Sequence, residues 1–281
     1  MLSLPFLLLF VVFTAGPVLS SLYMSFTDIK SRDLRSPFAV AFVGLENYSH
    51  VLGDDAFRQT AFNTAYFVLI GVPLTLGMAL AAALALDKGI TRFRTFFRVG
   101  YYTPVVTSIV AVAVVWRFLL RGDVGLVNSV LHLVGVQGPN WLGSTTWAMP
   151  SLIVMSSWRN FGTAMIIFLA GLQSVPVMLH EAAAIDGAST WQRFRHITVP
   201  LLRPTMLFVA VVTVIGYVQV FEEPFVMTNG GPLDSTTTLS MFTYQQFGFG
   251  NYGFASAAAY VLFVVVVCLT AIQFRFFRSN T

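Results

Sequence analysis

The stretch EAAAIDGASTWQRFRHITVP, residues 181–200, is a polar segment that lies between two long apolar segments of the chain. Its order of residues follows the rules by which helices end and begin. Gly187 suits a left-handed C-terminal cap, because glycine has no Cβ to clash at positive φ. Ser189 is followed three positions later by Gln192, which is the spacing of a reciprocal capping box. The pattern predicts two short helices that meet at a glycine elbow.

The outer limits of this segment are also marked by residues typical of helix ends. Ser174 can cap the first helix, and Pro176 is tolerated in its first turn because the missing N–H would be unpaired there. Pro200 is expected to end the second helix. We therefore define a polar loop of residues 174–200 within a single domain, residues 1–281.

Two roles are open for this loop from its helix pattern alone. Its Ala-rich surface would let another protein approach closely. Alternatively, Trp191, Phe194, Arg193 and Arg195 would suit an amphipathic helix that rests on lipid headgroups.

The rest of the chain is apolar enough to be an integral membrane protein. Apolar residues make up 56% of the sequence and charged residues only 10%. A membrane-spanning helix needs roughly 20 mostly apolar residues, and such stretches occur at residues 2–24, 61–86, 99–120, 147–172, 201–220 and 254–274. The fold class we predict is an all-α integral membrane protein with about six transmembrane helices. The first stretch exceeds the usual apolar length of a signal peptide and no Lys or Arg precedes it, so we interpret it as an anchor.

The distribution of basic residues predicts the orientation, because Lys and Arg are enriched in cytoplasmic loops. Arg98, Arg193, Arg195 and Arg275 lie on the same side of the predicted spans, and the excess of basic residues on that side is moderate. This places both termini and the polar loop in the cytoplasm. The net charge of +4 is then explained by topology, and no nucleic-acid partner is expected.

Sequence motifs of soluble catalysis are missing. There is no Gly-x-x-x-x-Gly-Lys phosphate loop, no His-Glu-x-x-His pair and no Gly-x-Ser-x-Gly turn. We therefore expect no catalytic, cofactor-binding or metal-binding residues on this chain. Cys268, the single cysteine, lies in the last apolar run and is expected to be a buried small apolar side chain.

The polar loop resembles the EAA loop of permease subunits from bacterial ATP-binding-cassette importers. The residues that carry this resemblance are Glu181, Ala182, Ala183, Gly187, Ile197 and Pro200. Val199 stands where the family more often has Leu. Further blocks are similar to the first permease subunit of maltose-type and glycerol-phosphate-type uptake systems: GLENY at 44–48, NT at 63–64, FLAGLQSVP at 168–176, ITVPLLRP at 197–204 and TNGGP at 228–232.

This resemblance implies a set of partners and a location. In the family, the loop forms coupling helices that seat in a cleft of a cytoplasmic ATPase subunit. The expected partners are a second related permease subunit, two ATPase subunits that bind the ATP and Mg²⁺, an extracytoplasmic substrate-binding protein, the lipid membrane and a sugar. The expected location is the bacterial plasma (inner) membrane. The expected ATPase-coupling residues are Glu181, Ala182, Ala183, Asp186 and Gly187. Asp186 has an alternative role, a local hydrogen bond near the helix end.

Polar residues inside the predicted spans mark the expected substrate pathway, since such groups are costly in hydrocarbon and usually face a cavity or a partner. They are Arg159, Asn160, Gln219, Glu222 and Glu223, and Trp158 or Tyr217 is expected to cover the apolar face of a sugar. Pro224 is expected to break the fifth span and free backbone carbonyls. As alternatives, Arg159 forms a structural ion pair with one of the glutamates, or both glutamates lie in water at the outer interface. The turn at 228–232 is expected to shape the outer mouth, where the binding protein docks.

Together these features predict the permease subunit of a binding-protein-dependent carbohydrate importer. Within transport, the alternative is the same machinery for glycerol phosphates or another small polar solute. From other classes, the alternatives are an ion-driven secondary transporter, for which we find no convincing inverted repeat, and an intramembrane enzyme.

Overall fold

The computed structural model describes residues 4–35, 40–89, 93–122 and 124–278. Within these residues the chain is helical, and an isolated β-bridge joins Thr27 to Phe42. Among the described residues, five helical segments are long and apolar enough to cross a membrane. They are Leu4–Ser25, Asp55–Asp87, Ala148–Gln173, Thr190–Val218 and Tyr252–Phe276. The first consists of α1 Leu4–Phe10, a π-helical turn Val11–Ala15 and α2 Gly16–Ser25. The second is mostly α4 Asp55–Leu84, the third is α8, and the last lies in α14 Tyr252–Arg278. The predicted start of the first span at residue 2 lies outside the described residues.

The third predicted span, residues 99–120, differs from the expected single helix. It is divided into α5 Arg94–Val106 and α6 Ile109–Leu119, which meet at 98°. Thr107 and Ser108 between them leave the helical conformation, with ψ of 145° and 126°. Pro104, three residues earlier, removes one N–H from the helical ladder and weakens the last turn of α5. The chain therefore has either a broken sixth span or a re-entrant segment at this point.

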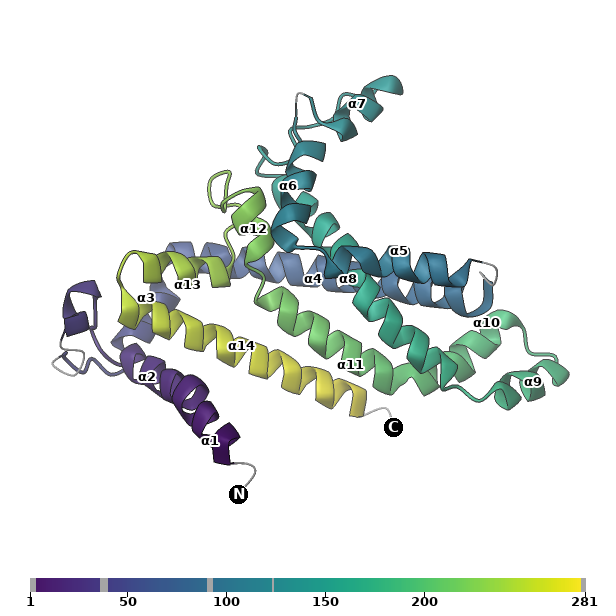
Figure 1. Cartoon of the computed structure of the whole chain (residues 1–281), viewed down its shortest axis with the longest axis horizontal. Coiled ribbons are helices and arrows are strands. Elements are labelled where there is room, and N and C mark those ends of the chain that lie inside the picture. Colours follow the sequence, from purple (N-terminus) through teal and green to yellow (C-terminus); the bar gives the residue numbers. More distant parts are fainter. Residues whose placement is uncertain (1–3, 36–39, 90–92, 123, 279–281) are drawn as a thin grey trace.

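The long helices α4, α8, α11 (Val199–Val218) and α14 form the body of the molecule (Figure 1). α4, α8 and α11 pack against one another, and α14 packs against α11 and α2. α8 is the most deeply buried of the spans. The remaining helices are η2 Ser31–Arg35, α3 Glu46–Gly53, η3 Ala85–Gly89, α7 Leu126–Leu133, α9 Val177–Ile185, α10 Thr190–Arg193, η4 Phe194–Thr198, α12 Glu222–Met227 and α13 Leu239–Gly248.

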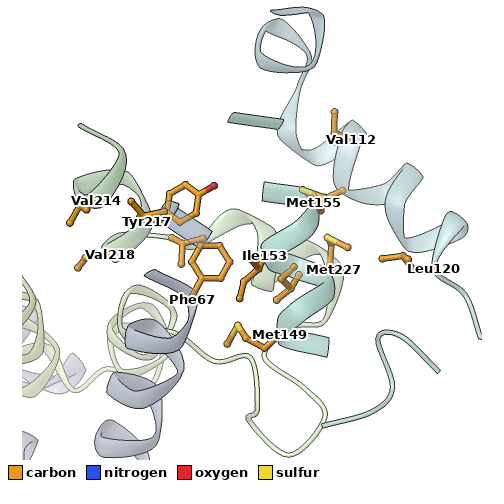
Figure 2. Packing of buried hydrophobic residues seen from close by; sticks show 14 residues of the cluster. Phe67, Val112, Leu120, Met149, Ile153, Met155, Val214, Tyr217, Val218 and Met227 are labelled. Carbon is orange, nitrogen blue, oxygen red and sulfur yellow. The ribbon is translucent and has the colours of Figure 1, made fainter. Parts of the chain in front are cut away.

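The core forms where α4, α8 and α11 meet. Phe67, Ile153 and Tyr217 come from these three helices and lie together in Figure 2, with Phe67 and Tyr217 ring centroids 5.1 Å apart. A second cluster, which includes Phe168 and Leu202, continues the core toward the end of the bundle that bears α9 and α10. Such buried apolar contacts hold the helices in register and fix the positions of the polar residues between them.

Polar side chains of the NT block at 63–64 and the GLENY block at 44–48 bind the backbone of connecting segments. Asn63 on α4 donates from its Nδ2 to the carbonyls of Asp234 and Thr237, at 2.8 and 2.9 Å. Thr64 accepts a hydrogen bond from the backbone N–H of Leu239 at 3.0 Å. Asn47, in the GLENY block, donates to the carbonyls of Ser25 and Thr27. These amide and hydroxyl groups tie connecting segments to the helical body.

Cys268 is exposed on α14, so the expectation that it is buried is wrong. The buried residues of α14 gather near its start, at Ala255, Ala257 and Ala258. Cys268 lies about three turns further along the helix, where less of the surface is covered by other helices.

Candidate functional site

A cavity of about 430 Å³ opens between α8, α11 and the segment that follows α11. It is lined by Phe67, Ser156, Arg159, Asn160, Thr163, Ala164, Ile167, Val209, Val212, Thr213, Gly216, Tyr217, Gln219, Val220, Phe221, Glu222 and Glu223. Six of the seven residues expected along the substrate pathway therefore line one cavity: Arg159, Asn160, Tyr217, Gln219, Glu222 and Glu223. We call it the central cavity.

One face of α8 supplies much of the polar lining. Ser156, Arg159, Asn160 and Thr163 are spaced three, four and seven positions apart, so they follow one another along the same side of the helix. The Ser156 hydroxyl is buried and has no hydrogen-bond partner among the described residues. Ser156 and Thr163 were not predicted from the sequence, although their helical spacing from Arg159 was a usable signal.

Trp158 is the exception among the expected pathway residues. It is absent from the lining of the central cavity, and its ring packs against that of Trp116 on α6 at 5.6 Å between centroids. Consecutive residues on an α-helix point about 100° apart, since each turn holds 3.6 residues. Trp158 therefore faces a different side of α8 from Arg159.

Tyr217 is held in the cavity wall by residues of α4. Its hydroxyl forms a 2.5 Å hydrogen bond with the Oγ1 of Thr75. A Cβ at Gly71 would lie 2.6 Å from Cε1 of the Tyr217 ring, so only glycine leaves room for the ring at this position. The ring position thus depends on contacts from a distant part of the sequence.

The helix break beside the cavity does not lie at Pro224 as expected. α11 ends at Val218 and α12 begins at Glu222, so the break precedes the proline. Pro224 occupies the first turn of α12, where a missing N–H has no helical partner to lose. The carbonyl of Val220 in the break accepts a hydrogen bond from the Thr238 hydroxyl at 2.7 Å.

The two glutamates of α12 differ in their surroundings. Glu223 is buried, whereas Glu222 is exposed. Within the part of the chain that the structure describes, no ion pair joins either glutamate to Arg159. The Nη1 of Arg159 instead donates to the Oδ1 of Asn160 at 3.2 Å, and its buried Nε has no partner in the described residues. The alternative of a structural ion pair is therefore not supported, and the alternative of two glutamates in water fits only Glu222.

The polar loop forms a second candidate site at the end of the bundle, beyond the last turn of α8 (Figure 1). α9 ends in a Schellman motif, in which the N–H of Gly187 bonds the carbonyl of Ala184 and the N–H of Ala188 bonds that of Ala183, at 3.1 and 2.8 Å. Gly187 has φ of +81°. The left-handed elbow predicted from the sequence is confirmed.

The second helix of the loop begins as predicted but does not end as predicted. The capping box is present, with Ser189 Oγ accepting from the Gln192 N–H and Gln192 Oε1 accepting from the Ser189 N–H. However, Pro200 falls in the first turn of α11, directly after a π-helical turn, and the helix continues to Val218. A proline is tolerated where the hydrogen-bond ladder changes its register. The predicted short helix is thus the N-terminal extension of the helix that forms the fifth predicted span.

The start of the first loop helix also differs from the prediction. Pro176, not Ser174, is the N-cap residue of α9. Ser174 instead ends α8, where its hydroxyl donates to the carbonyl of Gly171 at 2.7 Å. A serine close to two helix ends can serve either one, and the sequence does not distinguish them.

The loop presents an exposed surface that no other described element covers. Ile185 is 87% exposed and Met178 is 74% exposed, and no residue of α9 is buried. The carboxylates of Glu181 and Asp186 make no ion pair within the described residues. The alternative role of Asp186, a local side-chain hydrogen bond, has no counterpart in the structure. Large apolar side chains exposed together in this way are typical of a protein interface.

The turn at 228–232 continues into a tightly hydrogen-bonded loop. Asn229, Leu233 and Asp234 have positive φ, which is uncommon for residues with a Cβ. The hydroxyls of Thr228 and Thr236 hydrogen-bond each other at 2.7 Å, and Leu233 is 90% exposed.

No group of three or more His, Cys, Asp or Glu side chains placed to hold a metal ion occurs among the described residues.

Comparison with known proteins places these two sites in context. Residues 71–279 match the family described as "Binding-protein-dependent transport system inner membrane component". The chain is 39% identical to a probable ABC transporter permease protein of Bacillus subtilis, over 96% of this chain and 87% of that protein. It is 34% identical to the lactose transport system permease protein of Rhizobium radiobacter, over 98% of this chain and 92% of that protein. Its fold is similar to a chain of a bacterial ABC transporter involved in the import of alginate, with a TM-score of 0.83 and 24% identity. The match covers 100% of this chain and 94% of that chain.

Proposed function

Because the chain belongs to the family of inner membrane components of binding-protein-dependent transport systems, we propose that it forms half of the translocation pathway of a sugar importer. It is a multi-pass membrane protein and a transport subunit rather than an ATPase. The similar lactose permease supports a carbohydrate substrate. The observation that carries the proposal is the central cavity, which joins amide, carboxylate and guanidinium groups to the Tyr217 ring inside a helical bundle.

The chemistry of the central cavity suits a sugar. Hydroxyl groups both donate and accept hydrogen bonds, so Asn160 and Gln219 can serve them with either half of their amides, and Glu223 can accept from them. The hydroxyls of Ser156 and Thr163 add further partners along α8. The Tyr217 ring offers an apolar face to a sugar ring.

A second candidate substrate is favoured by one specific observation. The buried Nε of Arg159 has no partner among the described residues, and an arginine fork binds phosphate and carboxylate oxygens well. A glycerol phosphate or another small anionic solute would satisfy it. Uptake assays that compare a neutral sugar with an anionic one distinguish these two substrate classes.

The energy comes from separate subunits in this proposal. Two cytoplasmic ATPases bind ATP and Mg²⁺, and each seats on the polar loop, residues 174–200, of one permease subunit. We call this segment the coupling loop from here on. Glu181 is exposed for a contact with a basic group of the ATPase, and the left-handed elbow at Gly187 sets the direction of α9. Both termini then lie on the same side as the coupling loop, which the basic residues Arg98, Arg193 and Arg195 favour.

Purification of the tagged chain in mild detergent tests the proposed assembly. We expect a second permease subunit and an ATP-hydrolysing subunit to co-purify, and we expect added binding protein with its sugar to stimulate the hydrolysis. A chain that purifies without an ATPase, and that transports when an ion gradient is imposed, would support the secondary transporter instead.

A further inference from the structure

A second large cavity, of about 620 Å³, lies at the root of the coupling loop. Its polar lining consists of Asp87, Gln173, His180, Thr190, Arg193 and Thr198. These residues come from the cytoplasmic ends of the second and fourth spans, from α9, and from the helix that leads into α11. Cavities of about 300 to 1,000 Å³ are the size in which small molecules bind. We call it the root cavity.

Thr198 provides the most direct sign that the root cavity receives a ligand. The residue is 1% exposed, and its hydroxyl has no hydrogen-bond partner among the described residues. Other threonines in the helices of this chain donate to the carbonyl four residues earlier, as Thr64 and Thr243 do at 2.8 and 2.9 Å. Thr198 ends a π-helical turn, where the hydrogen-bond register is shifted, and such turns often occur at functional sites.

Arg193 adds a positive charge and a second unused donor. Its Nε is buried and has no partner among the described residues, while its Nη2 donates to Thr190 Oγ1 at 3.4 Å. Asp87 is the acidic residue of the lining, and its Oδ1 lies 3.9 Å from the Nη2 of Arg94. Arg94 thus neutralises part of the Asp87 charge, and Arg193 and Thr198 supply donor groups to the lining.

We propose that the root cavity binds an anionic oxygen group of the phosphate type, held by Arg193 and the Thr198 hydroxyl. The group belongs either to a soluble anion or to a lipid headgroup. The expected ATPase-coupling residues Glu181, Ala182, Ala183, Asp186 and Gly187 do not line this cavity, although it borders α9 through Val177 and His180. A ligand there ties α9 to the ends of two spans and restrains the lever that couples ATP hydrolysis to transport. Binding itself is independent of the proposed function, because it is tested on the chain alone.

Thermal unfolding of the full chain in detergent measures this binding. Inorganic phosphate is titrated against potassium chloride of equal ionic strength, and we expect a saturable rise in Tm. Thr198→Val and Arg193→Gln should weaken binding by about tenfold or more, since hydrogen bonds to charged groups are the strong ones. Arg195→Gln, an exposed arginine outside the lining, is the matched control and should leave binding unchanged.

The same variants identify the source of the anion in nanodiscs. Stabilisation by phosphatidylglycerol over phosphatidylcholine assigns the site to a lipid headgroup, and stabilisation by phosphate alone assigns it to a soluble anion. Thr198→Val keeps the side-chain shape and removes a hydroxyl without a partner, so it should fold normally, and Thr198→Ser should restore binding. No saturable effect of either probe, or equal effects in wild type, Thr198→Val and Arg193→Gln, overturns the proposal.

Discussion

Residues that interact within the coupling loop are close together in the sequence, whereas residues that shape the central cavity are far apart in it. The hydrogen bonds of the elbow join residues three to five positions apart, such as Ala188 to Ala183. The wall of the central cavity depends on the bond between Thr75 and Tyr217, which are 142 positions apart. No residue of α9 is buried, whereas Tyr217 is buried.

This difference predicts different consequences of mutation. An exposed element whose shape is locally encoded can be altered without disturbing the rest of the bundle, so its variants should lose coupling and retain folding. In a buried element held by contacts between distant residues, a substitution also disturbs the packing. Its variants should therefore lose stability together with a smaller loss of function.

The largest effect is expected at the elbow. Gly187→Val forces a β-branched residue into a left-handed conformation, at a local cost of about 1 to 3 kcal/mol, and should redirect α9. We expect loss of ATPase binding or of hydrolysis stimulated by the binding protein, with normal membrane insertion. A pull-down of the ATPase and a hydrolysis assay in nanodiscs measure both.

Gly135→Val is the matched control for that variant. Gly135 has φ of +77°, and in both glycines a Cβ would meet no atom within 4 Å, so the two substitutions carry the same strain at different places. Equal losses of coupling in the two variants would show that strain, and not the loop, is responsible. Glu181→Lys, which reverses an exposed charge without strain, should uncouple like Gly187→Val.

The next effect concerns the two glutamates of α12. Glu223→Ala should lower the apparent affinity for substrate by about 5- to 150-fold if its carboxylate loses a hydrogen bond in a dry site, equivalent to about 1 to 3 kcal/mol. Glu222→Ala should have a smaller effect, because Glu222 is exposed. Concentration-dependent uptake, with the yield of assembled complex as control, separates substrate contact from a structural role. A reversed order of the two variants contradicts this assignment.

A moderate effect is expected where α4 supports the cavity wall. Gly71→Ala places a Cβ 2.6 Å from the Tyr217 ring and must displace it. We expect a several-fold loss of substrate affinity together with a lower Tm, of the order of the 1 to 3 kcal/mol typical of overpacking. Thr75→Val removes the hydroxyl partner and keeps the side-chain volume, so it should affect affinity with less loss of stability. Unchanged uptake in both variants would remove Tyr217 from the pathway.

The smallest effect is expected for Trp158→Leu. The Trp158 ring packs on Trp116 outside the central cavity, so its removal should change Tm and leave the apparent substrate affinity within about twofold. A loss of affinity as large as that of Glu223→Ala would mean that the transport cycle exposes Trp158 to the substrate.

The same contrast explains which features the sequence could predict. The positive φ of Gly187 and the capping box of Ser189 follow from residues within one or two helical turns, and both were predicted correctly. The uninterrupted helix across Pro200 was missed, because a π-helical turn cannot be distinguished from an α-helical one by spacing alone.

In the central cavity, the sequence identified the polar residues but not their arrangement. The cost of burying polar groups pointed to Arg159, Asn160 and Glu223. The roles of Gly71 and Thr75 depend on packing between α4 and α11, which no local pattern reveals. Trp158 was assigned by residue type, whereas its position on the helix directs it away from the cavity.

Reconstituted transport tests most directly the claim that this chain supplies a pathway and a lever but no energy. Liposomes that contain the chain alone should neither hydrolyse ATP nor accumulate sugar under an imposed proton or sodium gradient. Liposomes that also contain the second permease subunit and the ATPase should accumulate sugar when ATP and the loaded binding protein are supplied. Gradient-driven uptake by the chain alone would contradict the account.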